Sequence, residues 1–161
     1  MADLVTHIAT ALLWKSATRK PAAIMALGVV LPDLAGRVPT MLLAPLALHG
    51  VPVPEAVVYG FNAIHTPFGI LASTLLLSLL FREDQRKEVW ANLAGGGALH
   101  MALDLLQSHV GVGYPLLLPF SGWHWEAGLI GTEATVKLAP VIGPLSLALW
   151  LWRRPKAAQA G

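Results

Sequence analysis

Long apolar segments, interrupted by prolines and by short charged clusters, constrain most strongly what this chain can fold into. Apolar residues dominate 22–31, 55–81 and 132–152, and a chain of 161 residues has no core large enough to bury three such segments. The chain is 55% hydrophobic and only 12% charged, about half the usual charged share, and its mean hydropathy is +0.62. We therefore expect residues 1–161 to form a single integral membrane domain.

We predict an all-α fold, because a helix satisfies its backbone hydrogen bonds within the segment that crosses the lipid. The expected fold is a polytopic helical domain with about four transmembrane helices and a short amphipathic N-terminal helix. An interfacial or re-entrant segment is expected at 40–48, which is too short to span. Pro32 should stop or kink the helix before it, and Pro67 should bend the longest helix. In chain order, the helices are expected at 3–18, 22–31, 55–81, 89–108 and 132–152.

Three basic clusters predict the orientation of these helices. The clusters lie at alternate ends of successive apolar segments, so all three can face the cytoplasm under the positive-inside rule. They are Lys15/Arg19/Lys20, Arg82/Arg86/Lys87 and Arg153/Arg154/Lys156. No helix presents a basic stripe with interleaved aromatic residues. We therefore expect membrane lipid, and no nucleic acid, as the partner.

The pattern most typical of a functional site lies within residues 95–120. On a helix, Gly97, His100, Asp104 and Ser108 fall three or four apart and form one polar stripe on an apolar rod. A histidine and a carboxylate one turn apart can share a metal ion. A buried His–Asp hydrogen bond explains the same pair equally well, so both interpretations stay open for this stretch. Because the chain has no cysteine, a metal would depend on histidine and carboxylate ligands.

Other ionisable residues reach a similar depth in the predicted membrane. At about 1.5 Å rise per residue, Asp33, His65 and the His100/Asp104 pair lie roughly 20–25 Å from their basic clusters, and His7 about 12 Å. Such groups cost several kcal/mol unless they are paired, and they mark functional sites. A metal site, a proton or ion pathway and a structural polar network are all open. We favour the metal site, because three histidines and two aspartates exceed what a structural network needs.

Arg37 lies four residues after Asp33, on the same predicted side of the membrane. Its planar guanidinium suits a phosphate group. Snorkelling of the side chain to the lipid headgroups explains its position equally well. His49 and His109 lie at loop edges and are expected to be solvated turn residues, whereas His124 lies between tryptophans and is expected to anchor the interface.

Five short motifs follow one another along about residues 1–120. They are Thr6-His7, Gly28-Val29-Val30-Leu31-Pro32-Asp33, His65-Thr66, His100-Met101-Ala102-Leu103-Asp104 and Gly113-Tyr114-Pro115-Leu116-Leu117-Leu118-Pro119-Phe120. In order and spacing they resemble the YdjM-like family of membrane-bound metal-dependent hydrolases. The resemblance implies a metal-dependent hydrolase of a bacterial inner membrane, with His7, Asp33, His65, His100 and Asp104 as its functional positions. Ala35 departs from the family, which usually carries a second acidic residue at this position. The departure bears on whether a second metal binds and on whether the protein is active.

The polar layer and the resemblance together predict a divalent metal, zinc, as the cofactor. Its expected ligands are His7, His65, His100 and Asp104. Asp33 is expected to be a further ligand or the base that orients water, and Arg37 to be the second catalytic group. The expected reaction is hydrolysis of an ester or phosphoester of a lipid or amphiphile by metal-activated water. The alternative is a small membrane transporter, or a proton or metal pathway, that uses the same side chains.

The orientation can be tested with a reporter fused after Gly161. It should report a cytoplasmic C-terminus, because the last basic cluster follows the final apolar segment. An alkaline phosphatase fusion should be inactive and a fluorescent protein fusion bright. The opposite pair of readings would place the polar layer toward the cytoplasm.

Overall fold

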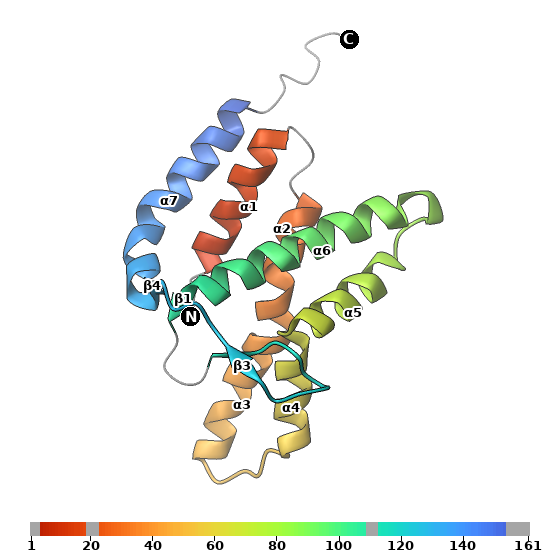
Figure 1. The fold of residues 1–161 in the computed structure, drawn as a ribbon, viewed down its shortest axis with the longest axis vertical. Coiled ribbons are helices and arrows are strands. Elements are labelled where there is room, and N and C mark those ends of the chain that lie inside the picture. The colour runs from red at the N-terminus through yellow and green to blue at the C-terminus, as the bar shows by residue number, and fades with distance from the viewer. Residues whose placement is uncertain (1–3, 19–22, 109–112, 154–161) are drawn as a thin grey trace.

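The computed structural model describes residues 4–18, 23–108 and 113–153, which are mostly helical (Figure 1). The helices are α1 (Leu4–Thr18), α2 (Ala23–Pro32), the π-helical turn η1 (Asp33–Arg37), α3 (Val38–Leu48), α4 (Glu55–Ile64), α5 (Pro67–Ser78), α6 (Glu83–Leu106) and α7 (Thr132–Arg153). Two short strand pairs join β1 (Gln107–Ser108) to β4 (Ile130–Gly131) and β2 (Tyr114–Pro115) to β3 (His124–Trp125). The all-α expectation is confirmed.

The segments α2, η1 and α3 form one continuous helix, so the prediction that Pro32 could stop it is wrong. Pro32 keeps helical dihedrals, φ −60° and ψ −44°, although its ring removes one backbone donor. The distortion is absorbed in the π turn that follows, where the Val38 N–H bonds to the Asp33 carbonyl five residues back. The separate re-entrant segment predicted at 40–48 is also wrong, because those residues continue this helix.

The single bent helix predicted at 55–81 is instead two helices, α4 and α5, whose axes differ by 75°. Thr66 is the N-cap of α5: its hydroxyl accepts from the Gly69 N–H and donates to the Ala63 carbonyl. Pro67 occupies the first turn of α5, where a missing N–H costs nothing. This capping stops α4 at Ile64 and leaves His65 at the corner between the two helices.

Two further boundaries differ from the expectation. Helix α6 begins at Glu83 and not near Val89, because Glu83 and Asp84 suit the positive end of a helix dipole. It ends at Leu106, so Ser108 leaves the polar stripe and lies exposed on β1. The last helix, α7, agrees with the prediction to within one residue at its end, and it continues through two prolines.

Helices α2 and α6 cross in close contact at facing glycines. A Cβ on Gly28 would lie 2.2 Å from the Leu93 carbonyl oxygen, and a Cβ on Gly96 would lie 2.3 Å from the Met25 carbonyl oxygen. Small residues permit such backbone contact between membrane helices. Gly97 faces Ile70 of α5 in the same way, so α6 lies between α2 and α5. This crossing brings the C-terminal half of α6 beside the π turn.

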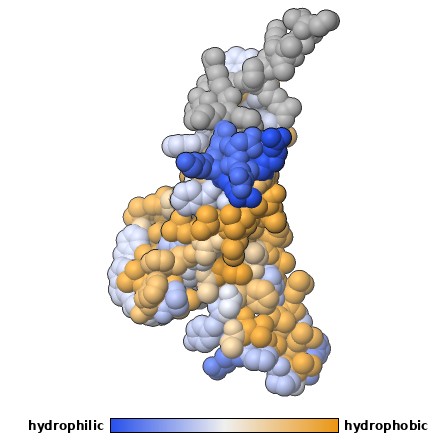
Figure 2. All heavy atoms as spheres, turned by 90° about the vertical axis from the view of Figure 1, so that its right-hand side faces the viewer, coloured by the Kyte–Doolittle hydropathy of each residue, from blue (hydrophilic) through white to orange (hydrophobic). Residues whose placement is uncertain are grey.

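Polar side chains are buried beside apolar ones, and many large apolar side chains are exposed. Buried polar residues come from several helices, and large apolar side chains are exposed on α5 and α7. Those on α7 are Val136, Leu138, Val141, Leu145, Leu147, Leu151 and Trp152. Figure 2 shows the charged start of α6 as a hydrophilic patch next to a broad hydrophobic surface. Such a surface is typical of contact with lipid or with another protein.

Length and composition support part of the predicted membrane topology. Within the described residues, Ala23–Leu46 is long and apolar enough to cross a membrane. A second crossing is obtained if α4 and α5 together make one bent span. The first helix turns its polar residues inward, with Thr6 and His7 buried and Val5 and Trp14 exposed.

The helix crossing can be tested with two neighbouring glycines. Gly96→Ala should lower the free energy of unfolding by about 1–3 kcal/mol, because its Cβ meets backbone that cannot rotate away. Gly95→Ala is the matched control, because nothing lies within 4 Å of its Cβ. It should raise stability by about 0.5–1 kcal/mol through helix propensity. Thermal unfolding in detergent measures both; an equal effect at the two positions would contradict the close crossing.

Candidate metal centre

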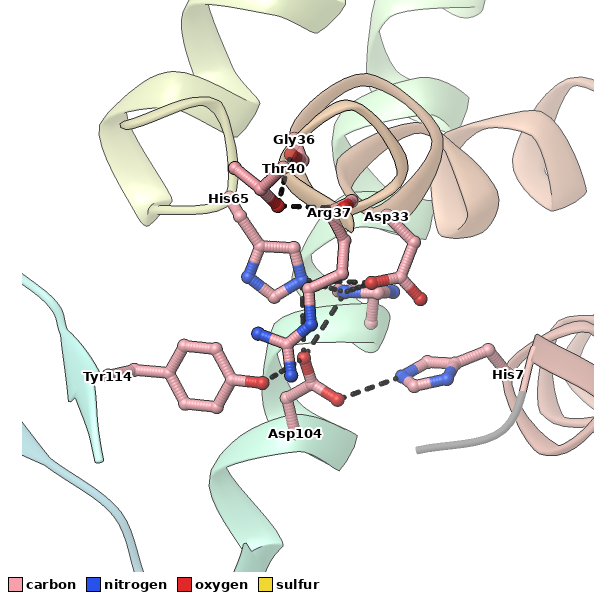
Figure 3. A network of polar contacts seen from close by, with 9 residues as sticks. His7, Asp33, Gly36, Arg37, Thr40, His65, Asp104 and Tyr114 are labelled. Carbon is pink, nitrogen blue, oxygen red and sulfur yellow. Dashed lines mark hydrogen bonds and ion pairs between the residues drawn. The ribbon is translucent and has the colours of Figure 1, made fainter. Parts of the chain in front are cut away.

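Five histidine and aspartate side chains from four segments meet at the crossing of α2 and α6 (Figure 3). Helix α6 contributes His100 and Asp104, which are 0% and 3% exposed. They lie one helical turn apart, with His100 Nε2 3.3 Å from Asp104 Oδ2. The remaining three are His7 of α1, Asp33 of the π turn and His65 at the α4–α5 corner.

His7 is delivered by the inward-facing side of α1 and is fully buried. Its ring stacks on that of His100, with the ring centroids 4.2 Å apart. The Nε2 atom of His7 lies 3.3 Å from Asp104 Oδ1. The two oxygens of Asp104 therefore face different histidines, Oδ1 toward His7 and Oδ2 toward His65 and His100.

The π turn and the helix corner bring Asp33 and His65 together. Gly36 makes this possible, because a Cβ there would lie 2.8 Å from the Phe61 carbonyl and 3.2 Å from the His65 Cβ. Asp33 Oδ1 consequently lies 3.3 Å from His65 Nε2. Thr40 supports the turn by donating its hydroxyl to the carbonyls of Gly36 and Arg37. A π turn in an α-helix is a frequent feature of functional sites.

The separations between these atoms suit a tetrahedral cation. Ligands at about 2.0–2.1 Å from zinc are about 3.3–3.4 Å from one another. Asp104 Oδ2 lies 3.3 Å from His100 Nε2 and 3.4 Å from His65 Nε2. The His65–His100 pair is closer, at 2.8 Å between the Nε2 atoms, which is the distance of an N–H···N hydrogen bond. A cation would replace the shared proton of that bond.

The five residues form two overlapping groups, each of which could hold a metal ion. One is His7, His100 and Asp104, and the other is Asp33, His65 and His100. Within each group, the ligand atoms lie within 4.8 Å of one another. Both groups contain His100, and this overlap favours a single cation over two separate ones. The structure thus brings together all five side chains that the sequence singled out; their action as ligands stays a prediction.

Tyr114 belongs to this cluster, and the sequence interpretation did not include it among the functional residues. Its phenol donates to Asp104 Oδ2 at 2.7 Å, and its ring stacks on His65 with centroids 5.3 Å apart. Burial, followed by the neighbouring Asp104 carboxylate, raises the pKa of Tyr114. Its position in the Gly113–Phe120 motif is the signal in the sequence that could have identified it.

The other residues considered in the sequence lie at different positions. Arg37 ends the π turn, half-buried, and Figure 3 shows its guanidinium directed toward the cluster. No carboxylate of the described chain lies within ion-pair distance of it. His49 and His124 are exposed, and His109 lies outside the described residues.

No family model, curated protein or solved structure matches the chain.

Metal binding can be tested on His100 and Asp104. His100→Ala and Asp104→Ala should each abolish stoichiometric zinc, and the double variant should lose little more stability than either alone, because the two act on one ion. In the wild type, zinc at 100 times its dissociation constant should stabilise the fold by about 2.7 kcal/mol, an effect that a chelator removes.

His49→Ala is the matched control, because His49 is exposed at the end of α3. It should keep the zinc content and melting temperature of the wild type. A structural polar network would give a different result: wild-type protein without metal, whose melting temperature does not respond to chelator or to added zinc.

Proposed function

We propose that this chain is a multi-pass membrane protein of about four spans with a metal-dependent hydrolase site at its centre. Exposed apolar side chains on α5 and α7 and buried polar ones between the helices support the membrane setting. The expected inner-membrane location and cytoplasmic C-terminus are part of this proposal. The family resemblance of the sequence motifs supports the same class of protein.

One observation carries the proposed function: buried histidine and aspartate side chains from four segments converge with the spacing of metal ligands. Burying such groups costs several kcal/mol of folding free energy. A purely structural role does not require so many buried ionisable side chains. Zinc is proposed because three imidazoles and one carboxylate are ligands that it prefers. When bound, a divalent cation supplies Lewis acidity, which activates water at neutral pH and polarises the bond to be cut.

Asp33 is proposed to be the residue that orients the attacking water. Its side chain is 19% exposed, whereas those of His7, His100 and Asp104 are at most 4% exposed, so Asp33 lies at the open edge of the cluster. A carboxylate at this edge can accept a proton from water, because a cation held by His65 Nε2 would release Asp33 Oδ1 from its pair with that atom. His7, His65, His100 and Asp104 are then the ligands.

The substrate class follows from charge and from access. Two carboxylates balance a divalent cation, and neutral histidines add nothing, so the Arg37 guanidinium leaves one uncompensated positive charge. A phosphodiester monoanion matches that charge better than a neutral carboxylic ester does. Leu34 and Val38, on the same turn as Asp33 and Arg37, are 54% and 41% exposed. The exposed surface of this helix next to Asp33 and Arg37 is therefore apolar, which suits the chains of a lipid or amphiphile.

A proton or ion pathway is the second candidate function. His65 and His100 share a direct 2.8 Å hydrogen bond, and Asp33 and Asp104 pair with them on either side. Such a continuous relay can pass protons without any metal. It predicts metal-free protein together with pH-dependent transport in liposomes.

The substrate class can be tested with Arg37 variants of zinc-loaded protein. In detergent micelles containing a fluorescent phosphatidylglycerol analogue, Arg37→Gln should reduce hydrolysis by about 10²-fold, because a donor to the phosphate is lost. The rate of Arg37→Lys should lie between those of the wild type and Arg37→Gln, since an ammonium keeps the charge but cannot donate two parallel hydrogen bonds. Arg86→Gln is the control, because Arg86 pairs with Glu83 at the far end of α6. Equal rates for Arg37→Gln and wild type, or a preference for neutral diacylglycerol, would contradict the phosphoester proposal.

A further inference from the structure

Tyr114 makes contact with two members of the cluster from a segment that lies outside the helices. Its phenol donates to Asp104 Oδ2, and its ring lies against His65 with an angle of 25° between the ring planes. The side chain is 7% exposed. In Figure 3 it closes the cluster on the side opposite His7.

The orientation of the Asp104 carboxylate decides which histidines each of its oxygens faces, because the two oxygens have different neighbours. Oδ1 faces His7, and Oδ2 faces His65 and His100. If His7, His65 and His100 held a cation through their Nε2 atoms, those atoms could not donate protons to the carboxylate. Among the described contacts of Asp104, the Tyr114 hydroxyl is the donor that remains.

We propose that Tyr114 is a positioning residue of the metal centre: it fixes the Asp104 carboxylate and thereby couples metal binding to the docking of residues 113–131. The proposal rests on the metal centre of the proposed function but not on any hydrolysis. Hydrogen bonds from an outer residue to a ligating carboxylate fix its orientation and raise metal affinity. The site predicted from the sequence does not include Tyr114.

The chain around Tyr114 is held against the end of α6. Tyr114 pairs with Trp125 in the β2–β3 ladder. The Ala127 N–H bonds to the Leu105 carbonyl at 2.7 Å, one residue after Asp104. Gln107 pairs with Ile130 immediately beyond. These bonds dock the segment on the helix turn that carries Asp104, so a bound cation and the docked segment should stabilise each other.

The test compares the two tyrosines of the chain by Tyr→Phe substitution. Tyr114→Phe keeps the ring against His65 and removes only the hydroxyl. Its zinc affinity, measured by competition with a chromogenic chelator, should fall about 10–100-fold, and its cobalt(II) absorption bands should shift. The metal-free variant should remain folded, with a melting temperature lowered only by the loss of one hydrogen bond to Asp104. Tyr59→Phe is the matched control, because Tyr59 is 63% exposed on α4, and it should bind zinc like the wild type.

Hydrogen exchange tests the coupling directly. Zinc should raise the protection of the Ala127 amide in the wild type, and raise it much less in Tyr114→Phe. Wild-type zinc affinity in Tyr114→Phe, or equal zinc-induced protection in both proteins, overturns this inference and leaves the metal centre standing. Wild-type protein that binds no zinc overturns the metal centre as well. Zinc binding without hydrolysis of any tested ester overturns only the hydrolase proposal.

Discussion

The rest of the structure depends on the burial of the Asp104 carboxylate. A charge placed in an apolar setting costs several kcal/mol unless hydrogen-bond donors or cations surround it. Asp104 is 3% exposed, and its neighbours His7, His65, His100 and Tyr114 come from α1, the α4–α5 corner, α6 and β2. Because each neighbour belongs to a different element, satisfying this one carboxylate requires most of the fold to be in place. The cluster around Asp104 therefore also fixes how these elements pack against one another.

Two departures from regular helical structure and one close helix crossing bring the cluster residues within reach of one another. The π turn follows Pro32 and presents Asp33, the capped corner at Thr66 presents His65, and the glycine contact of Gly28 with α6 brings His100 beside both. Each departure has its own local compensation, such as the hydroxyl bonds of Thr40 and Thr66. Irregular backbone of this kind is tolerated at membrane depth where it surrounds a polar site.

For a membrane protein, the apolar exterior and the polar centre would have one common cause. In a membrane setting, lipid gives helices no hydrophobic reason to associate, so close packing and interhelical polar contacts must hold them together. The glycine crossing of α2 and α6 supplies the first, and the His–Asp cluster supplies the second. A cation at the centre would add its binding free energy to the folded state alone. Stability and the proposed chemistry would then depend on the same few side chains.

The sequence by itself determined the helical class, because long apolar segments with polar stripes every three or four residues are local properties. It also identified the five cluster residues, since ionisable side chains are costly and therefore rare in such segments. Only the tertiary structure decided that Pro32 leads into a π turn and that Tyr114 reaches Asp104. Whether a proline breaks a helix depends on what packs against it, and a loop residue has no periodicity that reveals its partner. Those partners are set by the glycine-mediated crossing of α2 and α6 and by the docking of residues 113–131 on the end of α6.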